Sequence, residues 1–360
     1  MYISSLSLKN FRNYKSLDIS FSPFTNVIYG DNAQGKTNIL EALYMFAQGR
    51  SHRAKSDREL IMFGEDAARL SLDFHDSERD YGAVMQLGRN GKKTIKINHV
   101  QISRLSKLMN YLNAVMFAPE DLTLIKGSPG ARRHYTDAAI SQLFPGYLSS
   151  LSDYQKALIQ KNNALKNLSA YGGKTALDVW NEQLAESGAK IMNYRAEFIK
   201  SVNGYAKKIQ AEISKEELDI SYAPGIRIDE MTAGAYYDFL RLHADKEIAF
   251  YSSAYGIQRD DIIIKINGAP AKIYASQGQQ RTAALALKIA QAEYIYEQKE
   301  EYPVLLLDDI MSELDINRRA YLSERIRDKQ VFITSTDTDL VSSSNQTKLF
   351  KIKNGTAYEE

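Results

Sequence analysis

The first residues whose types and spacing could bind a ligand form a glycine-rich loop near the N-terminus. Residues 30–37 read Gly-Asp-Asn-Ala-Gln-Gly-Lys-Thr, a G-x-x-x-x-G-K-T pattern between an apolar run at Val27 and a helical run from Ile39. In such a loop, backbone N–H groups and a helix N-terminus surround the phosphates of a nucleotide. Lys36 would reach the β- and γ-phosphates, and the Thr37 hydroxyl would ligate Mg²⁺. A glycine-rich turn that binds nothing is the alternative, and the flanking strand and helix argue against it.

Two carboxylates follow a second apolar run. Residues 303–307 read Pro-Val-Leu-Leu-Leu and are followed by Asp308 and Asp309. This is the pattern of a parallel strand that is covered on both faces and whose C-terminal end points into a site. We therefore expect Asp308 to hold Mg²⁺ with Thr37, directly or through water. The alternative is that the two acids only cap the next helix.

A third polar group stands before another helical run. Residues 276–282 read Ser-Gln-Gly-Gln-Gln-Arg-Thr. Serine is a good helix N-cap, which is sufficient to explain Ser276 alone. It leaves unexplained the glutamines and the arginine around Gly278, which put several hydrogen-bond donors at a helix N-terminus. The segment therefore predicts a second anion-recognition site.

Composition restricts the classes of protein. The 360 residues suffice for one large domain or two, and 46 Lys and Arg against 44 Asp and Glu give a net charge of +2. Any nucleic-acid surface must therefore be local. The absence of cysteine excludes disulfides, thiolate chemistry and zinc–sulfur sites, and it fits a reducing, cytoplasmic compartment. We expect no signal peptide and no membrane span.

Periodicity gives an α/β order of elements. Alternation predicts two strands between Ile3 and Phe21, and 70–98 predicts a β-meander with a hairpin turn at Asn90-Gly91. From about 130 the period becomes helical. One run covers 131–144, a second extends from Leu148 to a break at Gly172-Gly173, and a third covers 180–209, which Gly188 and Gly204 could interrupt. These helices could form a short antiparallel arm.

The rest of the chain returns to strands. A strand around 218–222 and a helix over 231–250 lead back to a sheet pattern from Ile262 that continues to Ile273 and Tyr274. Residues 330–337 predict a core strand, and 348–353 predict an edge strand rich in lysine. We expect three segments: a first lobe over 1–130, a helical lobe with the arm over 131–255, and a return to the first lobe over 256–360.

Two basic features have two interpretations each. Arg12 could lie beside the nucleotide, or its stem could cover the edge of the first sheet. The basic turn, defined here as residues 49–58 (Gly-Arg-Ser-His-Arg-Ala-Lys-Ser-Asp-Arg), could contact a polyanion or remain a solvated loop. Both alternatives stay open on the sequence.

The order of the motifs resembles the SMC- and Rad50-like ABC-type ATPases of chromosome maintenance, and within them the RecF family of bacterial recombination mediators. The resemblance spans essentially the whole chain. It implies an ABC-type ATPase head with a helical second lobe and an arm too short for the coiled coils of SMC proteins. The segments that carry it are 8–14, 30–38, 49–53, 119–122, 126–129, 276–282 and 308–315. Gln258 stands where the family commonly has histidine, so no role of that histidine is transferred.

The resemblance implies roles for individual residues. Residues 276–279 would be the signature motif that contacts the γ-phosphate of ATP bound to a second copy, so that ATP holds a head-to-tail homodimer together. Asp309 would orient the attacking water. Because its side chain is shorter than that of the usual glutamate, the resemblance implies slow hydrolysis. Lys36 and Asp308 would be the other catalytic residues. The nucleotide contacts implied are Arg12, Gly30, Asp31, Asn32, Ala33, Gln34, Gly35, Lys36, Thr37, Asn38, Ser276, Gln277, Gly278, Gln279, Asp315 and Thr336.

By the same resemblance the function is that of an ATP-gated clamp on gapped, junction or duplex DNA. Its partners would be RecR and RecO, with RecA loaded indirectly, in replication restart and the SOS response. Arg132, Arg133, the basic turn and the lysines of the arm are the candidate DNA contacts. A P-loop kinase acting on a small molecule is one alternative, and a structural protein with a vestigial nucleotide site is another.

Overall fold

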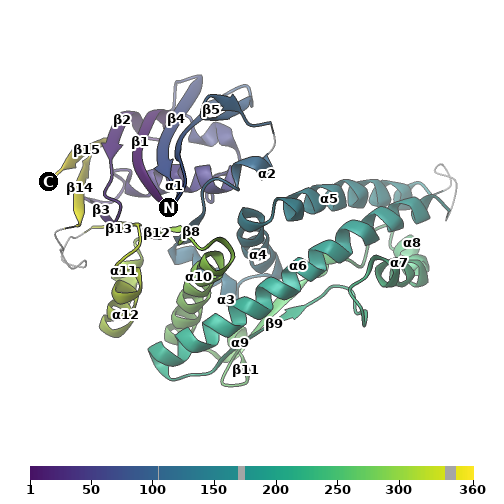
Figure 1. Cartoon of the computed structure of the whole chain (residues 1–360). Helices are drawn as coiled ribbons and strands as arrows, with labels where there is room; N and C mark the ends of the chain where they lie inside the picture. Colours follow the sequence, from purple (N-terminus) through teal and green to yellow (C-terminus); the bar gives the residue numbers. More distant parts are fainter. Residues whose placement is uncertain (104, 169–174, 337–345) are drawn as a thin grey trace. The chain divides into compact units, whose positions relative to one another are not determined.

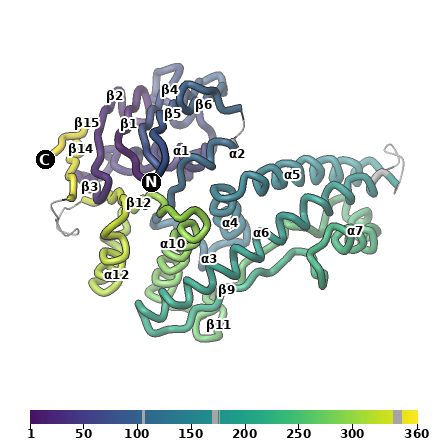
Figure 2. Tube along the Cα trace, in the orientation of Figure 1, coloured from purple at the N-terminus to yellow at the C-terminus, as the bar shows by residue number. Residues whose placement is uncertain are grey.

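The computed structural model describes residues 1–103, 105–168, 175–336 and 346–360. The chain forms two compact units (Figures 1 and 2). Unit 1 comprises Met1–Asp121, Glu212–Lys215 and Ala284–Glu360, and unit 2 comprises Leu122–Ala211 and Glu216–Ala283. The three segments expected from the sequence have boundaries at 130/131 and 255/256, whereas the chain passes between the two units at other residues. The three segments therefore stay a prediction.

Unit 1 contains a six-stranded antiparallel sheet in the order β2-β1-β4-β5-β6-β7. Apolar residues alternate along its strands because one face packs on the core and the other does not. The predicted N-terminal strands and the meander with its Asn90-Gly91 hairpin are confirmed. The strands are β1 (Tyr2–Phe11), β2 (Tyr14–Ser20), β4 (Ala67–His75), β5 (Asp80–Gly88), β6 (Lys93–Ile97) and β7 (Val100–Gln101).

A second six-stranded sheet in unit 1 has the order β15-β14-β3-β13-β12-β8 and is parallel except at β15. Every residue of β12 and β13 is buried, both the apolar runs that predict these strands and the polar residues Asp308, Thr334 and Ser335 at their ends. The expectation that 348–353 is an edge strand is wrong, since β14 lies between β3 and β15. The strands are β3 (Thr25–Tyr29), β8 (Ala114–Phe117), β12 (Val304–Asp308), β13 (Val331–Ser335), β14 (Lys348–Lys353) and β15 (Thr356–Glu359).

One core joins both sheets of unit 1 to helix α1 (Lys36–Gln48). Leu6 and Leu70 from the antiparallel sheet, Phe332 from the parallel sheet, and Leu40 and Phe46 from α1 belong to the same buried cluster. The core therefore fixes the phosphate loop between two rigid elements. The other helical segments are α2 (Leu105–Leu108), η1 (Asp57–Leu60), η2 (Pro119–Asp121), α11 (Ile310–Glu313), α12 (Ile316–Ile326) and α10 (Gln277–Lys299), whose residues up to Ala283 belong to unit 2.

Unit 2 is mainly helical. It contains α3 (Leu122–Lys126), α4 (Pro129–Leu143), α5 (Pro145–Lys166), α6 (Thr175–Ser214, whose residues from Glu212 on belong to unit 1), α7 (Ala233–Leu242), α8 (Ala244–Ala249), η3 (Ile257–Arg259), α9 (Ala271–Tyr274) and the sheet of β9 (Leu218–Ala223), β10 (Asp261–Ile266) and β11 (Ala269–Pro270). Helices α5 and α6 lie side by side (Figures 1 and 2), with Tyr147 near Tyr194 and Leu165 near Leu177. Two helices of the expected arm, α5 and α6, are therefore antiparallel. The expected break at Gly172-Gly173 lies outside the described residues.

Helix α6 is continuous over 40 residues, so neither Gly188 nor Gly204 interrupts it. A Cβ at Gly188 would lie 2.6 Å from the Tyr236 ring, which explains a glycine inside a helix.

Two expectations in unit 2 are wrong. The helix over 231–250 is two helices, because the backbone leaves helical geometry at His243, whose ring stacks on Phe239 at 4.1 Å. Ile273 and Tyr274 lie in α9 rather than in a strand, and both side chains are exposed. No helix within the described ranges combines the length and apolar composition needed to cross a bilayer.

Candidate functional site

The loop over 30–37 lies between β3 and α1 in unit 1. Positive φ angles at Gly30 (142°), Ala33 (64°) and Gly35 (112°) curl its backbone, and Gly35 is the N-cap of α1. Because α1 begins at Lys36, directly after the loop, the loop lies at the positive N-terminal end of this helix. This backbone is shaped to surround an anion, and the predicted phosphate loop has the strand–loop–helix setting that the motif requires.

Residues of the β1–β2 turn support the loop, which the sequence did not indicate. The Tyr14 hydroxyl donates to the Gly35 carbonyl at 3.0 Å, and Asn13 Nδ2 donates to the Gln34 carbonyl at 2.8 Å. Asn38 Nδ2 in turn donates to Asn13 Oδ1 at 2.9 Å. Asn38 therefore acts here as a support of the loop, and a contact between it and a nucleotide stays a prediction.

Gly30 should tolerate no side chain. A Cβ there would lie 2.5 Å from the Ile352 carbonyl oxygen, and its φ of 142° is one that other residues rarely adopt. Since the obstacle is backbone, Gly30→Ala should displace the loop from β14, weaken nucleotide binding by about tenfold or more, and destabilise unit 1 by roughly 1–3 kcal/mol. Calorimetric titration and thermal melting measure both effects. Gly268→Ala is the matched control, since its φ is also positive but nothing lies near its Cβ; equal nucleotide affinity for both variants would contradict the prediction.

Lys36 points back into the loop. Its Nζ donates to the carbonyl oxygens of Gly30 at 2.5 Å and Asp31 at 2.9 Å. Burial lowers the pKa of Lys36, against the attraction of Asp309, Asp31 and Asp308. The amine is thus held where phosphate oxygens could replace the loop carbonyls as its acceptors.

The ends of β12 and β13 meet the first turn of α1. Thr37 Oγ1 donates to Asp308 Oδ1 at 2.8 Å, and Thr334 Oγ1 donates to the same oxygen at 2.7 Å. Asp308 is only 8% exposed. The structure thus brings Thr37 and Asp308 together, as the sequence predicts, and adds Thr334, whose only signal in the sequence was a polar residue directly after the apolar run of β13. A hydroxyl and a carboxylate are the hard oxygen donors that Mg²⁺ prefers.

Asp309, Asp315 and Thr336 lie at the ends of neighbouring elements of unit 1. Asp309 has a left-handed backbone (φ 53°) and accepts a hydrogen bond from Ser312 Oγ at 3.2 Å. Asp315 caps α12 through the Arg318 N–H at 2.9 Å and pairs with the Arg318 side chain. Thr336 is an exposed residue just after β13. Their predicted nucleotide roles stay predictions.

Arg12 forms a two-pronged ion pair with Glu41 of α1, at 2.7 and 2.9 Å. Glu41 is fully buried. Burial raises its pKa, but hydrogen bonds from Arg12 and Ser51 outweigh this and hold the pKa of Glu41 below its ordinary value. Arg12 therefore ties the end of β1 to the helix that carries the loop, and a direct contact with a nucleotide stays a prediction.

The basic turn is anchored at one end and exposed at the other. Ser51 Oγ donates to Glu41 Oε1 at 2.5 Å, and the His52 ring packs edge-on against Tyr44. Burial lowers the pKa of His52, against the attraction of Glu41 and Asp308. The side chains of Arg53, Lys55 and Arg58 are exposed. The turn is therefore more ordered than a solvated loop and still presents cations.

The predicted second anion site lies in unit 2 at the start of α10. Ser276 Oγ accepts from the Gln279 N–H at 3.2 Å, and Gln279 Oε1 accepts from the Ser276 N–H at 2.8 Å. This is a reciprocal capping box. Gln279 Nε2 also donates to Glu216 at 2.6 Å, while Ser276 and Gln277 are exposed. An exposed helix N-terminus of this length can receive an anion.

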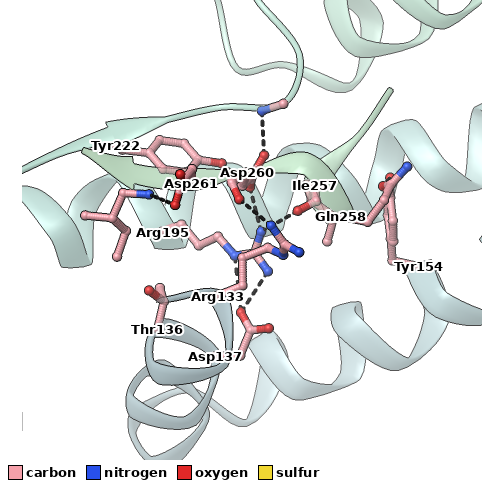
Figure 3. Close-up of polar contacts among 12 residues, drawn as sticks. Arg133, Thr136, Asp137, Tyr154, Arg195, Tyr222, Ile257, Gln258, Asp260 and Asp261 are labelled. Carbon is pink, nitrogen blue, oxygen red and sulfur yellow. Dashed lines mark hydrogen bonds and ion pairs between the residues drawn. The ribbon is translucent and has the colours of Figure 1, made fainter. Parts of the chain in front are cut away.

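Two candidate DNA contacts have other partners. Arg132 is 6% exposed and binds both carboxylate oxygens of Asp261 at 2.6 and 2.9 Å. Arg133 donates to the Asp260 carbonyl at 2.7 Å, and Gln258 accepts from the Tyr154 hydroxyl at 2.6 Å (Figure 3). Arg132 is thus a buried structural residue, and its proposal as a DNA contact is wrong.

Comparison with known proteins gives one consistent family. The family described as RecF/RecN/SMC N terminal domain matches residues 2–357. The DNA replication and repair protein RecF of Bacillus cytotoxicus is 40% identical over 366 residues, which cover 99% of this chain and 98% of the relative. RecF of Bacillus cereus is 40% identical over 368 residues with the same coverage.

Solved structures agree. The structure of the recombination mediator protein RecF with ATP in the RecFOR pathway has a TM-score of 0.93 and 34% identity, covering 100% of this chain and 97% of the other. The corresponding structure described with ATPrS also has a TM-score of 0.93 at 34% identity, covering 99% and 98%. An Smc head bound to the C-winged helix domain of ScpA, at a TM-score of 0.59 and 16% identity over 100% and 97% of the chains, shares the fold alone.

Proposed function

Because this chain belongs to the RecF family of SMC-like ABC-type ATPases, we propose that it is an ATP-gated DNA-binding clamp of recombinational repair. The observation that carries the proposal is the hydrogen bond between Thr37 and Asp308 beside a phosphate loop. It joins the two motifs that an ATPase uses to hold a triphosphate and its metal. The relatives solved with ATP support the choice of nucleotide.

The residues present fit Mg²⁺. Thr37 and Asp308 supply two oxygen donors, and Mg²⁺ is usually bound by one or two protein groups together with substrate phosphates and water. The ion would neutralise charge on the phosphates. The hydrogen bond from Thr334 keeps Asp308 oriented. The Lys36 amine would donate to phosphate oxygens in place of the loop carbonyls that now accept its hydrogen bonds. Asp309 would hold the attacking water as a short base, which supports slow hydrolysis suited to a timed clamp.

The start of α10 supports a homodimer that depends on ATP. In the proposed arrangement, residues 276–279 of one protomer receive the γ-phosphate of ATP bound to the partner, and Asp315 faces across the dimer. A helix N-terminus attracts the phosphate charge, so the triphosphate favours the closed pair by its extra contacts in that state.

The partners follow from the family. The solved relatives are described as mediators in the RecFOR pathway. We extend this to RecR and RecO as partners of the present chain, to gapped, junction or duplex DNA as its ligand, and to RecA loading, replication restart and the SOS response as the outcome. The cytoplasm is the proposed compartment.

Ser276→Arg should abolish the dimer that ATP induces. The arginine places bulk and positive charge where residues 276–279 would meet the partner's nucleotide, and it removes a cap worth about 1 kcal/mol. Sedimentation velocity should show wild-type dimers only when ATP is present. With ATP, the variant should remain a monomer at protein concentrations at least tenfold above those at which the wild type dimerises.

Thr232→Arg is the matched control. Thr232 is also an exposed N-cap in unit 2, accepting from the Ala235 N–H at 3.2 Å, so the same cap is lost elsewhere. It should dimerise normally. If Ser276→Arg also dimerised normally, the sandwich would be wrong, and a kinase acting as a monomer would become the better hypothesis.

A further inference from the structure

The outer face of the antiparallel sheet in unit 1 is hollowed. Two adjoining hollows of about 680 and 720 Å³ share Arg69, Gln86 and Thr94 as lining residues. We call the first of them the sheet groove. Its lining includes the charged residues Lys9, Asp66, Arg69, Arg89 and Lys92.

Strand register explains why cations gather in the sheet groove. Lys9 of β1 lies directly opposite Arg69 of β4, and Arg69 lies opposite Gln86 of β5. All three side chains are exposed, so they stand on the same outer face. Two cations directly opposite each other on neighbouring strands repel and destabilise a sheet. A bound anion would offset this repulsion.

The cations of the sheet groove are not neutralised by acids. Across the described ranges, Lys9, Arg69 and Lys92 form no ion pair. Arg89 donates to the backbone carbonyls of Glu65 and Met62, which leaves its positive charge in place. Asp66 is the acidic residue of the lining, so the groove carries four cations against one anion.

The basic turn adjoins the tip of the β5–β6 hairpin. Lys93 Nζ donates to the Gly49 carbonyl at 2.6 Å and pairs with Asp57 at 3.0 Å. On the same hairpin, a Cβ at Gly91 would lie 3.5 Å from a guanidinium nitrogen of Arg58. The exposed cations of the turn therefore continue the positive surface from Lys92 outward.

We propose that the sheet groove and the adjoining basic turn bind the phosphate backbone of duplex DNA. Charge complementarity favours a polyanion, and the groove has no aromatic residue in its lining on which unpaired bases could stack. The groove thus binds phosphates and reads no base sequence. The inference rests on the proposed function as a DNA clamp and names its surface in unit 1.

The test replaces three groove cations at once. Lys9→Gln, Arg69→Gln and Lys92→Gln are combined, and fluorescence anisotropy measures affinity for a labelled duplex, with ATP, over a series of salt concentrations. Each lost phosphate contact should reduce the slope of log K against log [salt] by about 0.9, so we expect a slope smaller by roughly 2–3 and affinity lower by tenfold or more. The control combines Lys15→Gln, Arg327→Gln and Lys353→Gln, which removes the same charge from exposed sites outside the groove. It should change the salt slope and the DNA affinity less than the groove variant does.

Stability and ATP binding separate a DNA role from a structural one. Because Lys9 and Arg69 repel each other, the groove variant should melt no lower than the wild type and should bind ATP equally well. A groove variant with wild-type affinity and salt slope would overturn the groove proposal and leave the clamp intact. A wild type without affinity for DNA would overturn both. Unchanged DNA binding with loss of polyglutamate binding would make the groove a surface for acidic polypeptides.

Discussion

Asp308→Asn should reduce Mg²⁺-dependent ATP turnover by about two orders of magnitude, the loss typical when one group that stabilises transition-state charge is removed. The amide oxygen can still accept from Thr37 and Thr334, which now lie 2.8 and 2.7 Å from Asp308 Oδ1. The loop and the strand ends are therefore retained, and what disappears is the negative charge that attracts the metal.

Binding without metal distinguishes this effect from damage. In EDTA, a carboxylate beside a triphosphate only repels it, so the variant should bind ATP at least as tightly as the wild type. Turnover against Mg²⁺ concentration and ATP affinity in EDTA are the two measurements. Asp328→Asn, at an exposed position of unit 1, is the control for a neutralised aspartate. Turnover within twofold of the wild type would remove Asp308 from the proposed metal site.

Arg195→Met should destabilise unit 2 by about 3–5 kcal/mol, because breaking a buried ion pair leaves charge without a partner. Arg195 is 3% exposed and pairs with Asp260 at 2.6 Å and Asp137 at 2.8 Å (Figure 3). It also donates to the Ile257 carbonyl at 2.9 Å. Tyr222 donates to the same Asp260 oxygen at 2.5 Å, so Arg195 and Asp260 together link α4, α6, β9 and the segment before β10.

Denaturant unfolding followed by tryptophan fluorescence measures this loss, because the single tryptophan, Trp180, lies in α6 and reports on unit 2. The control is Arg241→Met, which removes an exposed arginine of α7 and should change the free energy of unfolding by less than about 0.5 kcal/mol. Adding Asp260→Asn to the Arg195 variant should restore part of the stability, since it removes one of the unpaired charges. Equal midpoints for the two single variants would show that the network contributes little.

Local patterns predicted the parts of the site that short segments form alone. The phosphate loop, the strand that ends at Asp308 and the cap at Ser276 each depend on neighbouring residues, and the α/β fold of an ABC-type ATPase head is confirmed. The supports of the loop could not be predicted in this way. Asn13, Tyr14 and Thr334 contact the site across 20 residues or more of chain, where only packing decides which polar groups meet.

The errors have the same origin. The helical period over 231–250 continues through His243, but its ring stacks on Phe239 and the backbone turns there. Lysines in β14 indicated an edge strand, yet residues 356–359 return and cover that edge. Arg132 is predicted from the sequence as a DNA contact because nothing local indicates its ion pair with Asp261, which lies 129 residues further along the chain.

The capping box at Ser276 sets a limit on how tightly two copies could hold each other. The Gln279 N–H and the Ser276 hydroxyl already satisfy one another within the chain. A phosphate arriving from a second protomer would replace that hydrogen bond, so the contact is an exchange of acceptors and its net gain is reduced by the roughly 1 kcal/mol that the cap contributes. In the proposed dimer, each copy would therefore return to a satisfied helix end when the phosphate leaves. Separation should be fast for this reason, and reuse of the protein should require no refolding of the interface.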